Sequence, residues 1–434
     1  MNKNIFKNAA NIIESVQVPV IEGTVISAGE LYFEASLPFA KPGSIIEFEA
    51  LLGQIISVKD NNARIAPLNS APMPAVGDKV TLKQKNFMVS CGQSLLGRVI
   101  DPLYNPLDGK GPIENVEFNS VEKIAINPFD RKRVDTFLPT GIKVIDAMLS
   151  LGKGQRIGLF AGPGVGKSTL LGDLTKNSGA DVNVICLVGE RGREASEFVH
   201  EILGEKGLKN SVVILATSDS PPAQRTLALY CATTIAEWFR DEKKVDVLFL
   251  VDSLSRVVRA KRDIDFSHDK QNESAGFPLS ALSILPNLLE RAGCGINGTI
   301  TAVYTVLTDS SNDDPVKNEL QSLLDGHIFL NKNLADMGHW PAIDILSSVS
   351  RVMKLVKNKK DLENAETLKR VIAAYKSNED LILLGAYQKG SSKDTDIYIK
   401  NRDAIENFLT QKTDENFNIK DTQSELEKLI TLLR

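Results

Sequence analysis

The chain has 434 residues, of which 42% are hydrophobic and 24% charged, and its formal net charge is −4. This composition is typical of a globular protein of two or three domains, and it lacks the positive field of a nucleic-acid-binding protein, so we expect no nucleic acid among its partners. The four cysteines have no C-x-x-C spacing, which predicts neither a disulfide framework nor a zinc site, and no segment approaches the roughly 20 apolar residues of a membrane span.

The N-terminal part of the chain shows two patterns in succession. Residues 1–17 place apolar side chains at helical spacing and predict a short amphipathic helix. The first residues are basic, but Asn11 and Glu14 interrupt the apolar run that a signal peptide would need. Residues 18–92 alternate apolar and polar side chains between turns rich in Gly, Pro and Asn, which predicts a small β-barrel domain.

From residue 93 to residue 350, predicted strands alternate with predicted helices, a pattern typical of a parallel sheet covered by helices. The expected strands of this part are Arg156–Phe160, Val182–Val188, Val212–Leu215, Val245–Val251 and Thr299–Leu307. Residues 351–434 lose the strand pattern and keep a helical period, so a helical C-terminal domain is expected. The predicted fold class is therefore α/β, with a central sheet between a β-barrel and a helical domain.

A glycine-rich turn follows the first of these strands and precedes a predicted helix. It reads Ala161-Gly162-Pro163-Gly164-Val165-Gly166-Lys167-Ser168, and Thr169 continues into the helix. Backbone N–H groups of such a turn surround phosphate oxygens at a helix N-terminus, where the helix dipole favours anions. Lys167 can reach the β- and γ-phosphates, and the Ser168 hydroxyl can bind Mg²⁺. This turn, residues 161–168, has the pattern of a P-loop and predicts an ATP site with Mg²⁺, although Ala161 replaces the usual first glycine.

Two carboxylates follow neighbouring predicted strands. Asp252 directly follows the run Val245–Val251. Because a P-loop is present, Asp252 is expected to hold the Mg²⁺ shell. Without a P-loop, an aspartate in this position would be interpreted as a turn former or a helix cap. Glu190 comes after Val182–Val188 and is the candidate that polarises the attacking water. Alternatively, Glu190 and Arg191 belong to a solvated ion-pair cluster at the start of a helix.

Several motifs together resemble the type III secretion ATPases, a family that includes the flagellar export ATPase and its injectisome counterparts and is related to the catalytic subunit of F1 ATP synthase. The motifs are the P-loop, Gly189–Glu194, Asp252–Arg256, Leu289–Gly293, Leu324–Ile328, Pro341–Leu346 with Ser350–Val352, and Leu384–Gly390. The resemblance extends from about residue 18 to the C-terminus. It implies a RecA-like central domain that hydrolyses ATP to energise protein export.

The resemblance also implies roles for single residues. Arg191 and Arg256 match arginines that sense the γ-phosphate, and Arg351 matches the arginine finger that enters the site of a neighbouring subunit. Trp340 stands where the family has a tyrosine that stacks on adenine, although it could simply be a core aromatic residue. Tyr387 is likewise assigned to the nucleotide-binding residues.

One segment departs from the family pattern. The family usually has a Gly-Glu-Pro-Pro loop near the central channel of its ring, but Asp265–Ser274 contains neither Gly nor Pro. This departure bears on how hydrolysis is coupled to substrate unfolding or to a stalk protein. The phosphate-binding residues do not depend on it.

The favoured function is a homohexameric ATPase of a flagellar or injectisome export apparatus. The resemblance implies four kinds of partner besides the chain itself: a stator-like regulator at the N-terminal helix, a central stalk protein, export chaperones with their substrates, and the export gate at the cytoplasmic face of the inner membrane. A catalytic subunit of a rotary F-type or V-type ATP synthase is the alternative. The acidic net charge argues against an RNA translocase, and the intact Glu190 argues against a non-catalytic ring subunit.

Overall fold

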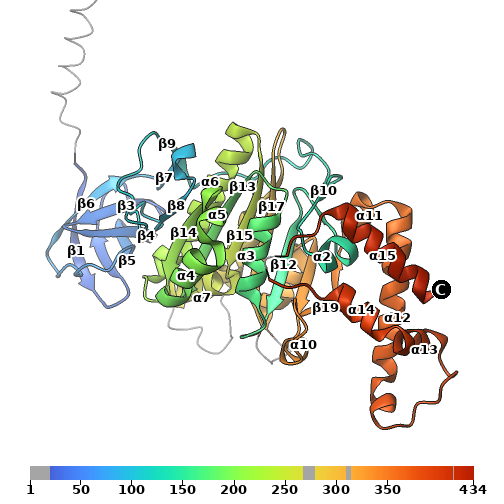
Figure 1. Ribbon diagram of the computed structural model, residues 1–434. Helices are drawn as coiled ribbons and strands as arrows, with labels where there is room; N and C mark the ends of the chain where they lie inside the picture. The colour runs from blue at the N-terminus through green and yellow to red at the C-terminus, as the bar shows by residue number, and fades with distance from the viewer. Residues whose placement is uncertain (1–19, 267–278, 309–313, 414) are drawn as a thin grey trace, which may run out of the picture. The chain divides into compact units, whose positions relative to one another are not determined.

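The computed structural model describes residues 20–266, 279–308, 314–413 and 415–434, which form two compact units, Met1–Phe87 and Met88–Arg434 (Figure 1). The helix expected over residues 1–17 lies outside the described residues, and so does most of the loop Asp265–Ser274. No described helix combines the length and apolar content that crossing a bilayer requires.

The first unit is a closed antiparallel barrel with the strand order β1-β2-β5-β4-β3-β6. Its strands are β1 (Glu22–Ala28), β2 (Phe33–Ser36), β3 (Ile45–Phe48), β4 (Leu51–Lys59), β5 (Asn62–Pro67) and β6 (Lys79–Gln84). Alternate residues point inward, and Phe33, Ile46 and Ile65 are fully buried in the centre. The barrel predicted from the alternating pattern is confirmed.

The second unit contains a nine-stranded sheet, ordered β19-β18-β12-β17-β15-β13-β14-β8 with β16 attached to β17. Its strands are β8 (Arg98–Ile100), β12 (Arg156–Ala161), β13 (Val182–Glu190), β14 (Ser211–Thr217), β15 (Asp246–Asp252), β16 (Gly293–Cys294), β17 (Thr299–Leu307), β18 (Gly326–Leu330) and β19 (Ile343–Ser350). Two small sheets pair β7 (Met88–Cys91) with β9 (Glu117–Ser120), and β10 (Phe137–Leu138) with β11 (Leu151–Gly152). The central strands are parallel and buried on both faces, which explains their nearly continuous apolar sequences.

Helices cover both faces of this sheet. The helices of this part of the chain are η1 (Gln93–Leu95), α2 (Lys143–Met148), α3 (Lys167–Asn177), α4 (Gly192–Glu197), η2 (Phe198–Leu203), α5 (Gly204–Lys209), α6 (Pro222–Trp238), η3 (Phe239–Lys243), α7 (Leu254–Phe266), α8 (Leu279–Leu289), α9 (Pro315–Leu323) and α10 (Lys332–Asp336). Leu159, Leu187 and Leu250 belong to one core with α2, α3 and α4. Phe249 and Tyr304 alternate to the other face, on which α6 and α7 lie. The central sheet is therefore the middle layer of an α/β fold, as predicted.

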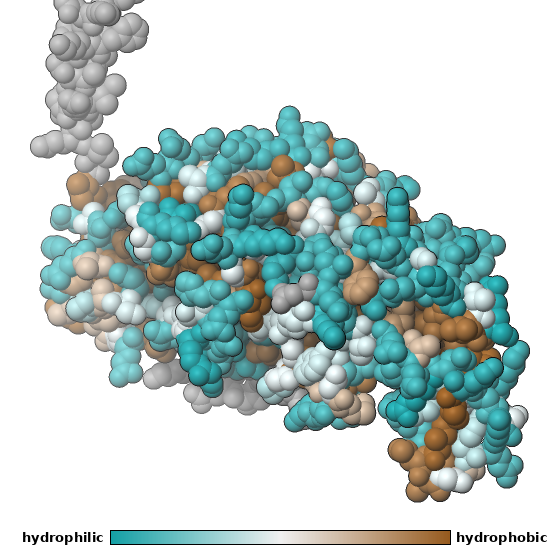
Figure 2. Space-filling model, in the orientation of Figure 1, coloured by the Kyte–Doolittle hydropathy of each residue, from teal (hydrophilic) through white to brown (hydrophobic). Residues whose placement is uncertain are grey.

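The described chain after Val352 is helical. It consists of α11 (Met353–Val356), α12 (Lys359–Leu383), α13 (Lys393–Lys400), α14 (Arg402–Leu409) and α15 (Ile419–Leu433). Helices α12, α14 and α15 pack against α2, and their apolar residues join the core of the P-loop face. Leu383 and Leu384, at the C-terminal end of α12, are exposed, and Figure 2 shows an apolar area on the surface of the C-terminal helices. The prediction that the C-terminal region is helical is confirmed. The predicted domain boundaries at residues 92/93 and 350/351 stay predictions.

One edge of the sheet differs from the parallel arrangement that the sequence predicts. Strand β19 pairs antiparallel with β18, and its residues alternate between buried and more exposed positions. An antiparallel edge strand with one covered face has this alternation, unlike the continuous apolar runs of the central strands. The direction of β19 carries Arg351 to the end of the sheet opposite the P-loop.

A buried ion pair joins α6 to the segment after α8. The guanidinium of Arg291 donates to both oxygens of Glu237 at 2.9 and 2.7 Å, and also to the Val121 carbonyl and the Thr234 hydroxyl. Both side chains of the pair are only 3% exposed. Because all these donors are satisfied, the pair can be tolerated in the core.

We expect Arg291→Met to destabilise the second unit by about 3–5 kcal/mol, because Glu237 would remain buried without its partner. Urea unfolding of the full chain measures this change. The matched control is Lys359→Met, which removes an exposed ion pair to Glu363 and should change stability by less than about 1 kcal/mol. Equal effects of the two substitutions would contradict a structural role for the buried pair.

Candidate nucleotide site

The P-loop connects β12 to α3 at the carboxyl edge of the parallel strands. Gly164 and Gly166 have φ values of 73° and 80°, a region that favours glycine and allows the tight turn. The turn borders a cavity of about 590 Å³. The cavity lining combines Ala161–Gly164 and Gly166–Thr169 with Glu190, Arg191, Asp252, Arg256, Arg259 and Thr308. The local sequence thus builds an anion cradle that opens into a polar cavity.

Lys167 lies between the two carboxylates that the sequence singled out. Glu190 is the last residue of β13 and Asp252 the last residue of β15, and these strands are neighbours. The ammonium of Lys167 lies 2.6 Å from Oδ1 of Asp252 and 3.3 Å from Oε1 of Glu190. The fold therefore brings together three residues that are far apart in the sequence.

Glu190 is also paired with Arg256, whose Nη1 lies 2.5 Å from the Glu190 carboxylate. Burial raises the pKa of Glu190, but the Arg256 guanidinium and the Lys167 ammonium outweigh burial and hold the pKa below its usual value. Glu190 is therefore ionised at neutral pH. An ionised carboxylate in this position can accept a proton or orient a water molecule.

Thr305 is a member of the site that sequence reasoning missed. Its hydroxyl donates to Oδ1 of Asp252 at 2.7 Å, and both residues are buried. Thr305 belongs to β17, which pairs with β15 in a register that aligns Val251 with Tyr304. The signal in the sequence was weak, because Thr305 is one of three threonines within the mostly apolar run Thr299–Leu307, and it became informative only once the strand order was known.

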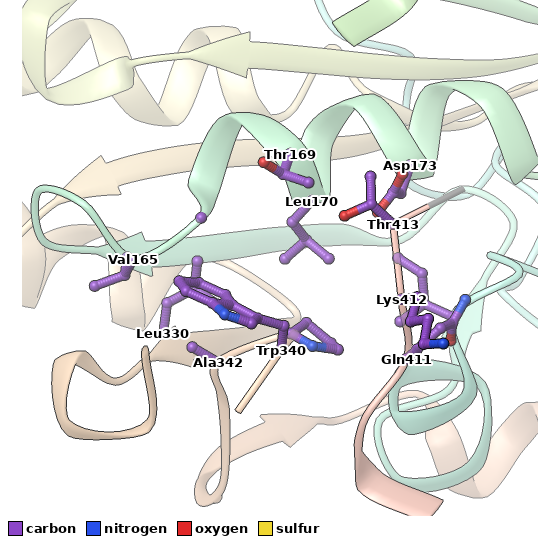
Figure 3. A pocket seen from close by; sticks show the side chains of 13 residues that line it. Val165, Thr169, Leu170, Asp173, Leu330, Trp340, Ala342, Gln411, Lys412 and Thr413 are labelled. Atoms are coloured by element: carbon purple, nitrogen blue, oxygen red, sulfur yellow. The ribbon is translucent and has the colours of Figure 1, made fainter. Parts of the chain in front are cut away.

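A second cavity of about 220 Å³ lies on the other side of the start of α3 (Figure 3). Trp340 lines it together with Val165, Thr169 and Leu330. The indole ring packs closely on the P-loop, since a Cβ at Gly166 would lie 2.7 Å from it. Trp340 is 41% exposed, which is more open than a core aromatic residue. An aromatic face beside a phosphate-binding turn suits a nucleotide base.

The opposite wall of this cavity is Gln411–Thr413, which sequence reasoning also missed (Figure 3). The backbone N–H of Gln411 donates to the Trp340 carbonyl at 2.8 Å, and its side chain donates to the Gly141 carbonyl at 2.9 Å. On α14, Glu406 lies 2.9 Å from Nδ1 of His339. The C-terminal helices thereby hold the segment that carries Trp340.

Two of the predicted residues contribute little or nothing to these cavities within the chain. Arg191 borders the larger cavity, but its side chain is 81% exposed and pairs with Glu194. The hydroxyl of Tyr387 lies 3.0 Å from Asp396, in the turn between α12 and α13, and Tyr387 lines neither cavity. Its assignment to the nucleotide therefore gains no support from the fold of the chain.

Arg351 lies too far from the P-loop of its own chain. Its N–H donates to the Asp325 carbonyl, and the Asp325 N–H donates to the Arg156 carbonyl at the start of β12. The P-loop begins after the six residues of β12, about 20 Å away at the usual rise of a strand. An arginine side chain cannot span this distance.

The two cavities meet at the start of α3, so one ligand can place its phosphates on the P-loop and its base against Trp340. Comparison with known proteins agrees with this arrangement. The model of the ATP synthase alpha/beta family, nucleotide-binding domain, matches residues 141–350, and the model of the T3SS EscN ATPase C-terminal domain matches residues 358–428. The chain is therefore a nucleotide-binding ATPase of the ATP synthase alpha/beta class.

Similar proteins show to which branch of this class the chain belongs. The flagellum-specific ATP synthase of Bacillus subtilis (strain 168) is 41% identical over 397 residues, which cover 91% of this chain and 88% of that protein. The SPI-2 type 3 secretion system ATPase of Salmonella typhimurium is 42% identical over 365 residues, 84% of each chain. The assembled ATPase EscN of enteropathogenic E. coli superposes with a TM-score of 0.89 at 38% identity, covering 95% of this chain and 100% of EscN. The chain belongs to the family of flagellar and type III secretion ATPases.

We expect Trp340→Ala to weaken the binding of adenine nucleotides by roughly tenfold or more, because base stacking contributes about 1–3 kcal/mol. Trp340→Phe should retain most of the affinity. A fluorescent ATP analogue measures both. In a Trp238→Phe background, Trp340 is the one remaining tryptophan of the chain, and its emission should change when ATP binds. Unchanged affinity and emission would show that Trp340 only packs on the P-loop.

Proposed function

We propose that the chain forms a homohexameric ring that hydrolyses ATP to energise protein export through a flagellar or injectisome apparatus. One observation carries this proposal: Lys167, Glu190 and Asp252 converge in a single cavity at the ends of parallel strands. This constellation contains the groups that phosphoryl transfer to water requires. The match of residues 358–428 to the EscN C-terminal domain favours the secretion branch over a rotary synthase.

Binding of ATP exchanges the partners of Lys167. In the structure, its ammonium is neutralised by Asp252 and Glu190. The β- and γ-phosphates offer a stronger negative charge, so Lys167 turns to them and the two carboxylates are released. Glu190, held by Arg256, then orients the attacking water in line with the γ-phosphate.

The metal-binding groups fit Mg²⁺. The Ser168 hydroxyl and the Asp252 carboxylate line the same cavity as the phosphate-binding turn, and both are the hard oxygen donors that Mg²⁺ prefers. When bound, Mg²⁺ neutralises charge on the β- and γ-phosphate oxygens. Few protein ligands are needed, because phosphates and water complete its coordination.

Arg351 acts on the neighbouring subunit. Its distance from its own P-loop excludes a role in its own site, and a ring of heterologous contacts presents the same edge of each subunit to the nucleotide of the next. An arginine supplied in this way stabilises the charge of the transition state. Arg191, which is largely exposed, and Arg256, which lines the cavity, are the other arginines that can approach the γ-phosphate.

The proposed partners follow from the family. EscN has been solved in complex with its central stalk EscO, with a TM-score of 0.87 to this chain over 94% of its length. A stalk protein of this kind is proposed here too, together with a stator-like regulator, export chaperones and their substrates. The ring would then lie in the cytoplasm, peripheral to the export gate at the inner membrane.

We expect Lys167→Ala to lose affinity for ATP, whereas Glu190→Gln should bind ATP normally and hydrolyse it at least about 10²-fold more slowly. The reason is that Lys167 compensates phosphate charge in the bound state, while Glu190 acts on water. Equilibrium binding of a fluorescent ATP analogue and steady-state phosphate release measure the two effects.

The matched control is Glu201→Gln, the same chemical change at an exposed side chain that lines neither cavity. It should retain nearly full activity. Equal loss of affinity in Lys167→Ala and Glu190→Gln would contradict the two roles.

Mixing experiments test whether the site is shared. Assemblies of pure Arg351→Ala or pure Glu190→Gln should both be inactive, with the finger worth about 10³-fold or more in rate. In mixed rings, an Arg351→Ala subunit keeps its Glu190 and can borrow Arg351 from a Glu190→Gln neighbour. With random equal mixing, roughly a quarter of the interfaces regain a full set of residues.

ATPase activity should therefore return when the two variants are mixed and reassembled, and size-exclusion chromatography checks that the rings form. If pure Arg351→Ala rings hydrolyse ATP at nearly the wild-type rate, Arg351 is no finger.

A further inference from the structure

The carboxylate of Asp252 has two donors on one oxygen. Oδ1 accepts from the Lys167 ammonium at 2.6 Å and from the Thr305 hydroxyl at 2.7 Å. Asp252 and Thr305 are 3% and 0% exposed, so water does not compete for these contacts. The two donors differ in kind, because Lys167 is a long mobile side chain and Thr305 is fixed within β17.

The two donors also differ in permanence. Lys167 turns to the phosphates when ATP binds, and Asp252 then loses its ion-pair partner. A buried carboxylate without a fixed donor would be free to rotate. The phosphates do not compete for the Thr305 hydroxyl. The strand that carries Thr305, β17, is hydrogen-bonded on both sides, to β12 and to β15.

We propose that Thr305 is a positioning residue that holds Oδ1 of Asp252 when Lys167 leaves, so that the other carboxylate oxygen faces the Mg²⁺ shell of the bound nucleotide. This inference rests on the proposed magnesium role of Asp252. The hydroxyl does not touch the nucleotide, and its effect passes through the orientation of the carboxylate. Outer-shell partners of this type typically contribute a factor of 10–100 to metal affinity or activity.

The test measures how strongly Mg²⁺ tightens nucleotide binding, without turnover. Affinity of a fluorescent non-hydrolysable ATP analogue is determined for the full chain in Mg²⁺ and in EDTA, and the ratio is the magnesium factor. Thr305→Val keeps the side-chain shape, loses the hydroxyl, and should reduce the magnesium factor about tenfold while affinity in EDTA stays unchanged. Thr305→Ser keeps the hydroxyl and should restore the wild-type factor.

Two further variants distinguish a failure of the inference about Thr305 from a failure of the magnesium role of Asp252. Thr301→Val removes another buried hydroxyl of the same strand, one that accepts from the Gly154 N–H, and should leave the factor unchanged. Asp252→Asn should lower it most. If Asp252→Asn lowers the factor and Thr305→Val does not, the inference about Thr305 is overturned and the magnesium role of Asp252 stands. If neither lowers it, the magnesium role itself is wrong.

Discussion

The partly buried ammonium of Lys167 is the group on which the organisation of this ATPase depends. A positive charge in a cavity of the protein needs a partner of opposite sign, and the partner must be weak enough to be replaced by phosphate. The chain meets both conditions by ending β13 and β15 in carboxylates beside the P-loop. The parallel order of the sheet brings these ends to one edge, and the helices on its two faces keep the strands in register. Arg256 and Thr305 restrain the two carboxylates as well, and each contacts the same carboxylate oxygen as Lys167.

The base side of the site depends on a different constraint. Trp340 is supplied by the segment before β19, Gln411 by the segment after α14, and Gly141 by the segment before α2. Hydrogen bonds join these three segments around one small cavity. The C-terminal helices are consequently part of the nucleotide site, since a displacement of α14 would move both Gln411 and Glu406, the partner of His339. Movements of these helices and the binding of adenine are therefore expected to be coupled.

The proposed role of Arg351 at a second subunit depends on the antiparallel direction of the edge strand β19. Had β19 been parallel to β18, Arg351 would end at the edge where the P-loop lies. Reversal of the strand moves it about 20 Å away, to the level of Arg156. The proposed finger cannot serve its own chain, and this suits the proposed ring, in which every subunit would complete the site of a neighbour.

The sequence by itself determined the barrel, the alternating central region, the helical end, the P-loop, and the two carboxylates after strands. These features are local, because the period of apolar residues, the glycines of a turn and the end of a strand are all written within about ten neighbouring residues. Only the tertiary structure decided that Thr305 contacts Asp252, that Gln411 closes the base cavity, and that Tyr387 lies apart from both cavities. The contacts of Thr305 and Gln411 join residues 53 to 270 positions apart. Such pairs depend on strand order, on strand direction and on which helix packs against which, and a linear pattern of residues contains none of these.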